Sequence, residues 1–185
     1  MATTTATATR TVWAIDPVHS SIEFAVRHLM IATVKGRFAG VSGTVVTDGF
    51  DLSNGEVEVA IDPATIDTRE ADRDAHLRSA DFFDVERFPA ATFKSRGVDN
   101  RRGDRFELAG DLTLRGVTQP VVLDVTTQGF GKDPWGGERA GFSASTTIKR
   151  SAFGLTWNQL LEAGGVAVGD EVRLTIDAEL VKQAA

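Results

Sequence analysis

Apolar and polar residues alternate through most of the chain, and this pattern predicts β-strands. In segment 21–28, Ile22, Phe24 and Val26 fall on one face of a strand and mostly polar residues on the other. The same two-residue period recurs at 56–62, 106–114, 121–126, 142–149 and 172–180, and segments 33–46 and 91–98 are rich in Val, Phe and Thr. We therefore expect about eight antiparallel strands.

One segment departs from the alternation. Residues 69–78 are mainly polar, and Asp67 and Glu70 have the spacing of a capping box. We expect a single solvated helix over about 69–78, packed on the sheet or across its end, followed by a short helical turn at 79–83. Turn clusters rich in Gly, Asn and Asp separate the strands, at 48–49, 53–55, 99–100, 102–104, 115–116 and 133–137.

The order of these elements predicts an all-β fold with one inserted helix. No βαβ alternation, linker or repeat divides the chain, so we expect one domain over 12–182, a disordered Thr/Ala-rich tail at 1–11 and a short tail at 183–185. The strands can form a barrel or a sandwich. An eight-stranded barrel either fills its interior with side chains or holds one ligand, and strand counting does not choose between these outcomes.

Composition narrows the function classes. The 185 residues are 42% hydrophobic and 25% charged, with a net charge of −6 and no cysteine. These values exclude a disordered chain, disulfides and thiolate metal sites, and they provide no basic surface for nucleic acid. No apolar run approaches the roughly 20 residues of a membrane span. The N-terminal segment 1–11 lacks the apolar core of a secretion signal, so we expect a cytoplasmic protein.

Segment 15–29 contains two short motifs, Asp16-x-x-His19-Ser20 and Phe24-x-Val26-x-His28-Leu29. With them, this segment resembles the start of the YceI-like family of lipocalin-like, polyisoprenoid-binding proteins. An ordered series of further motifs extends the resemblance from about residue 13 to 180: Gly36-Arg37-Phe38, Ile66-Asp67-Thr68, Arg73-Asp74-x-His76-Leu77, Phe82-Phe83-Asp84, Phe88-Pro89-x-x-Thr92-Phe93, Gly110-x-Leu112-Thr113-Leu114-x-Gly116-Val117-Thr118 and Arg150-x-x-Phe153-Gly154-Leu155.

The resemblance implies an extended eight-stranded antiparallel barrel around an apolar tunnel. It also implies a non-catalytic carrier for a long isoprenoid or similar lipid, without a required cofactor and often dimeric. The residues expected to line the tunnel share the inward face of their strands, where each would also suit a solid core: Phe24, Val26, His28, Val34, Phe38, Phe93, Phe106, Leu108, Phe142 and Ile148.

Polar residues at one mouth of the barrel are the candidates for contact with a head group. They are His19, Asp72, His76 and Arg150. Asp72 and His76 are spaced for an ion pair on one helix face. If the helix covers the mouth, His19, His28 and His76 can converge with Asp72 into a divalent metal site, although each also suits an ordinary structural contact. Arg150 suits an anionic head group or an ion pair with a carboxylate such as Asp67 or Glu162.

Two other functions remain open at this stage. One is an enzyme acting on lipids, with His28, Asp72 and His76 as acid, base or metal ligands. The other is an interaction module whose barrel is filled by its own side chains. The apolar segments 29–31 and 160–161 fit a lid over the mouth or a dimer contact.

Overall fold

The structure is a computed structural model that describes residues 10–49, 51–162 and 164–184, with only the backbone of residues 51–54. Its elements in chain order are β1 (Arg10–Ile15), β2 (Ser21–His28), β3 (Ala32–Asp48), β4 (Asp51–Asp67), α1 (Ala71–Arg78), β5 (Ala91–Arg102), β6 (Arg105–Leu114), β7 (Val117–Lys132), β8 (Glu138–Lys149), the 3₁₀ turn η1 (Arg150–Phe153) and β9 (Val168–Lys182).

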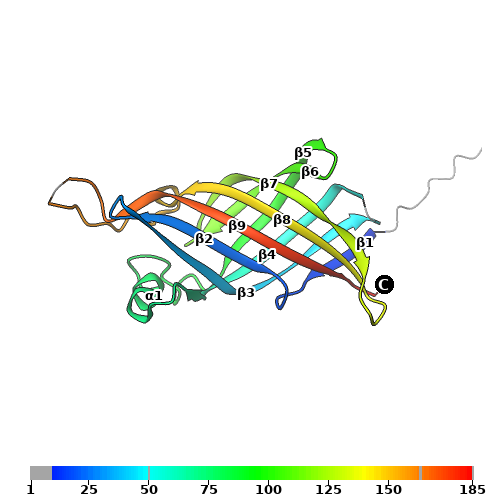
Figure 1. Ribbon diagram of the computed structural model, residues 1–185, viewed down its shortest axis with the longest axis horizontal. Coiled ribbons are helices and arrows are strands. Elements are labelled where there is room, and N and C mark those ends of the chain that lie inside the picture. Colours follow the sequence, from blue (N-terminus) through cyan, green and yellow to red (C-terminus); the bar gives the residue numbers. More distant parts are fainter. Residues whose placement is uncertain (1–9, 50, 163, 185) are drawn as a thin grey trace, which may run out of the picture.

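All strands belong to one antiparallel sheet that closes on itself. Strands β3 to β9 follow one another around the barrel, and β3 also pairs with β4. Strands β1 and β2 both lie between β3 and β9, so they share one strand position that is interrupted at residues 16–20. This confirms the predicted eight-stranded barrel. Figure 1 shows the strands crossing the long axis obliquely, with α1 beside one end.

Several element boundaries differ from those predicted. β1 begins at Arg10, so residues 10 and 11 belong to the sheet, whereas residues 1–9 of the predicted tail lie outside the described residues. The predicted turn at 53–55 is wrong, because these residues continue β4. The helix begins at Ala71 and its N-cap is Glu70, whose carboxylate accepts from the backbone N–H groups of Asp72 and Arg73. Asp67 instead accepts the N–H of Arg69.

Polar contacts hold α1 against the end of β4. The buried carboxylate of Asp74 accepts from both the backbone N–H and the hydroxyl of Thr68. The Arg78 guanidinium donates to the carbonyls of Ala64 and Ile66, at 2.7 and 2.9 Å. Because buried polar groups are costly without partners, these contacts fix the helix although most of its surface is hydrophilic.

The other end of the barrel is closed by a tryptophan. Trp13 is 2% exposed, and its indole Nε1 donates to Thr47 Oγ1 at 3.0 Å. It packs with Val45, Ala140 and Leu180 in a cluster separate from the main core. Trp13 therefore serves as an apolar plug whose one polar atom is satisfied.

A charged network lies at this end, where β1 passes into β2. Arg139 Nη1 donates to Asp16 at 2.9 Å and also contacts Glu179, and Arg139 Nε donates to Asp133 at 3.0 Å. His19 Nδ1 lies 2.9 Å from Asp16 Oδ2. Hydrogen bonds from His19 and, as the second largest cause, from Arg139 hold the pKa of the Asp16 carboxyl well below its usual range. The same hydrogen bond to Asp16 raises the pKa of His19.

We predict that His19→Gln lowers thermal stability more at pH 5.5 than at pH 8.5. Because the folded protein raises the pKa of His19, its contribution is complete below the unfolded value near 6.5 and is lost as the pH rises through the folded value. We expect a melting temperature about 1–3 °C below that of the parent at pH 5.5, measured by scanning calorimetry, and a smaller gap at pH 8.5.

The matched control is His28→Gln. His28 is exposed at the end of β2 and has no ion pair among the described residues. This variant repeats the exchange of residue type without removing the contact to Asp16, so its melting temperature should stay close to that of the parent. A His19→Gln gap that grows with pH would contradict the assignment of a protonated, Asp16-bound histidine.

Candidate functional site

The barrel encloses two apolar cavities. The larger, with a volume of about 170 Å³, is lined by residues from all strand positions, and its polar lining residues are Ser20, Thr146 and Asp177. The smaller, of about 120 Å³, lies toward α1, where Leu77, Phe82 and Phe83 join its wall. An engineered apolar cavity of roughly 150 Å³ stays dry and takes up small apolar guests, so both cavities suit hydrocarbon better than water.

Four aliphatic side chains line both cavities and form a waist between them. They are Ile22, Ile61, Leu112 and Leu174. Ile22 and Leu112 are buried, whereas Ile61 and Leu174 are half-buried. These side chains are aliphatic, so they can change rotamer without breaking hydrogen bonds. The waist is therefore an apolar constriction between two compartments of one bore, and it forms no polar barrier.

Eight of the ten predicted lining residues contribute to a cavity wall. Phe93, Phe106, Leu108 and Phe142 line the larger cavity, and Phe24, Val26, Phe38 and Ile148 line the smaller one. Val34 lines neither. His28 was expected to point inward, and this prediction is wrong: it is exposed at the end of β2, where the register with β9 shifts after Val26. Alternation assigns a face to a residue, but not the point along the strand at which the core ends.

Aromatic rings fill the wall of the smaller cavity near α1. The ring of Phe24 packs over Gly36, where an added Cβ would lie 2.4 Å from Phe24 Cζ. Phe24 contacts Phe38 at a ring-centroid distance of 5.6 Å, and Phe38 meets the edge of Phe83 at 5.7 Å. Gly36 therefore provides the space that an inward aromatic side chain needs in a closed sheet.

Arg150 also borders the smaller cavity, but its side chain is committed to the backbone. Its guanidinium donates to the carbonyls of Leu155, Trp157, Val168 and Gly169, at 2.6 to 3.1 Å. Its burial lowers the pKa of the guanidinium from its ordinary value. Arg150 thus holds the loop between η1 and β9 against the end of the bore.

The alternative expectation for Arg150 was an ion pair with Asp67 or Glu162. The structure contradicts it for Asp67, which pairs with Arg37 at 3.2 Å. The four carbonyl contacts of Arg150 come from residues that sequence periodicity does not link to it. In the sequence, Arg150 appears as a single basic residue at the end of a strand. This pattern specified neither a carboxylate nor the backbone carbonyls as its partner.

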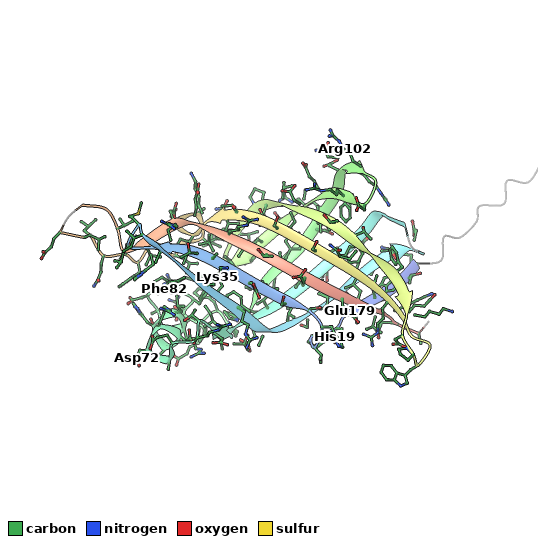
Figure 2. All side chains as sticks on the ribbon, viewed as in Figure 1. His19, Lys35, Asp72, Phe82, Arg102 and Glu179 are labelled. Carbon is green, nitrogen blue, oxygen red and sulfur yellow. The ribbon has the colours of Figure 1, made fainter. Side chains whose placement is uncertain are left out.

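The histidines do not converge. Figure 2 shows His19 beside Glu179 toward one end of the long axis and Asp72 near Phe82 toward the other. His76 pairs with Asp81 at 2.8 Å, so the predicted contact with Asp72 is wrong. The three histidines His19, His28 and His76 form no common metal-binding group among the described residues, so the alternative of a metal site built from them is not supported. Helix spacing placed Asp72 and His76 on one face, but the turn after the helix supplied a nearer carboxylate.

The ligand atoms of Asp16, His19 and Glu179 lie within 4.8 Å of one another. Three such groups can hold a divalent cation. Here the guanidinium of Arg139 already contacts both carboxylates. This cluster therefore behaves as an ion-pair network on the outside of the barrel.

Sequence reasoning missed the waist. Ile22, Ile61, Leu112 and Leu174 lie on four different strands, and each carries only the ordinary alternation of a buried strand residue. Their common position depends on the register of the strands around the barrel. No spacing within the chain distinguishes them from other inward residues.

Within the described part of the chain, α1 is too short and too polar to cross a membrane.

Comparison with known proteins agrees with this architecture. Residues 13–180 match the family model described as YceI-like domain. Protein YceI of Salmonella newport is 41% identical over 165 residues, which cover 89% of this chain and 83% of that protein.

Two solved structures share the fold. BcnA of Burkholderia cenocepacia superposes with a TM-score of 0.77 at 24% identity and covers 89% of this chain and 98% of that one. A polyisoprenoid binding domain from Saccharophagus degradans, implicated in plant cell wall breakdown, gives a TM-score of 0.69 at 14% identity and covers 92% of this chain and 98% of that one. The family-model match and the identity with YceI show that the chain belongs to the YceI-like family.

Proposed function

We propose that this protein is a non-catalytic carrier that holds a long apolar chain, an isoprenoid or a similar lipid, along the bore of its barrel. The observation that carries the proposal is the pair of apolar cavities joined at the waist of Ile22, Ile61, Leu112 and Leu174. A compact apolar ligand would need one compartment, whereas two aligned compartments suit an elongated one.

The energetics favour a hydrocarbon ligand. Burial of each CH₂ contributes roughly 0.8 kcal/mol, so a chain that extends through both cavities gains a large gross driving force. Part of this gain is offset by immobilisation of the chain. The polar residues that line the larger cavity are few, so hydrocarbon leaves few buried polar groups unsatisfied.

The arrangement of ionisable groups supports a binding role. Among the described lining residues, the ionisable ones are Arg150, committed to four carbonyls, and Asp177, which is exposed. A general acid or base must reach the reacting bond. The candidates for an enzyme, His28, Asp72 and His76, line neither cavity. The related polyisoprenoid binding domain gives independent support for the ligand class.

The filled-barrel alternative predicts no interior space. Cavities of about 170 and 120 Å³ argue against it. Well-packed cores contain few voids larger than a water molecule. The space inside this barrel therefore favours a ligand-binding role over a purely structural one.

We predict that binding affinity rises with chain length in the series geraniol, farnesol and geranylgeraniol, because each added carbon leaves water and contacts the apolar wall of the cavities. The expected gain is up to about fourfold in affinity for each added CH₂, until the cavities are full. The measurement is displacement of the fluorescent fatty acid cis-parinaric acid. Affinities that do not depend on chain length, together with native mass spectra free of lipid, would overturn the proposal.

We predict that Leu174→Phe shortens the accepted chain. The larger ring at the waist should weaken binding of geranylgeraniol by at least about tenfold, equivalent to about 1.4 kcal/mol. Geraniol, which fits one compartment, should lose about twofold at most. Val122→Phe is the matched control, because Val122 is 49% exposed on the outer face of β7. Equal losses for both alcohols would show that the waist does not separate two parts of one site.

A further inference from the structure

Among the described residues, the pairing between β4 and β5 stops part-way along both strands, and we call this boundary the seam. Their described pairing joins Glu58–Ile61 to Ala91–Lys94 and ends there. The next ladder, between β5 and β6, continues along β5 to Asp99 and Arg102, and the β6–β7 ladder runs from Arg105 to Leu114. Beyond the Glu58–Lys94 pair, the described residues of β4 pair with β3 and those of β5 pair with β6, but not with each other.

A β-bulge explains why the two strands separate at this point. The register of β5 against β6 shifts between Ser95 and Gly97. A bulge bends the strand that carries it and increases its twist. At the start of the divergence, the Val57 N–H donates to the side-chain oxygen of Ser95 at 2.8 Å, in place of a carbonyl of β5. The β5–β6 hairpin then stands out from the barrel, with Arg102 near its tip (Figure 2).

The larger cavity reaches this seam. Gly55 and Val57 on β4 and Val98 on β5 all line it, beyond the last ladder pair. Val57 and Val98 are half-buried. A salt bridge of 2.6 Å between Lys94 and Glu58 marks the closed side of the seam. Two aliphatic side chains therefore border the cavity where backbone pairing is absent among the described residues.

The ends of the bore are closed more firmly. Trp13 is 2% exposed at one end, and Phe153 is 1% exposed at the other, near the loop held by Arg150. Opening the first end requires displacement of Trp13 and loss of its hydrogen bond to Thr47. Opening the other requires displacement of Phe153 and of the loop whose carbonyls Arg150 binds. At the seam, among the described residues, the hydrogen bond from Val57 to Ser95 and the half-buried side chains of Val57 and Val98 stand between the cavity and solvent.

We propose that the divergence between β4 and β5 is a lateral portal, through which a hydrocarbon chain enters the larger cavity between Val57 and Val98. The portal rests on the proposed carrier function and adds the route of exchange. A chain that enters side-on passes through the wall while a polar head group stays in water. The portal therefore selects lipids with a slender apolar tail and a head group that remains outside.

A reversible cross-link tests the portal. The chain has no cysteine, so Glu56→Cys with Arg96→Cys gives a unique thiol pair beyond the last β4–β5 pair. A short reducible bis-methanethiosulfonate linker joins the thiols, and stopped-flow fluorescence follows uptake of cis-parinaric acid. We expect cross-linking to slow both uptake and release by at least about tenfold, with little change in their ratio, and reduction to restore both rates.

The control pair is Thr147→Cys with Arg173→Cys, which are exposed partners in the continuous β8–β9 ladder. Its cross-link should leave the rates unchanged. A second variant, Val57→Ala with Val98→Ala, should speed uptake and release together by about fivefold or more, whereas Val121→Ala, on the cavity wall of β7, should change release alone.

The outcomes separate the portal from the carrier function. If unmodified protein does not bind the probe, the carrier function fails. If it binds and the seam cross-link leaves both rates unchanged, the portal is wrong and the carrier function stands. Slower exchange with the control cross-link as well would assign the effect to general rigidity and overturn the portal.

Discussion

Closure of the sheet is the constraint on which the other properties of this protein depend. Eight strand positions joined edge to edge satisfy the backbone hydrogen bonds, and their number fixes a diameter close to the limit that side chains can fill. The interior residues are apolar, so the space left over is apolar too. The cavities thus follow from barrel geometry combined with a lining of aliphatic and aromatic side chains that does not fill the interior.

The polar groups of the molecule serve to close this bore and remain largely outside it. Asp74 and Arg78 fix α1 at one end, and Arg150 fixes the loop beside it. Arg139 joins three carboxylates at the end closed by Trp13. These contacts are directional, so they set the position of each closing element, whereas the apolar walls contribute most of the stabilisation.

The same closure is incomplete at the β4–β5 seam. The bulge at Ser95–Gly97 bends β5 away, and unpaired strand edges reduce local stability. A perfectly closed barrel would trap or exclude a long chain, because exchange would require broad loss of strand pairing. A local weakness on one side allows a stable container and an exchange route in one fold.

The sequence by itself determined the strand pattern, the single polar helix, the inward faces and, through the ordered motifs, the family. Phe24 and Phe106 were found because alternation is a local property of extended backbone. Only the tertiary structure decided that His28 lies beyond the core, that His76 pairs with Asp81 and that Arg150 binds carbonyls. The waist and the seam also depend on register between strands distant in the chain, and local patterns carry no record of that register.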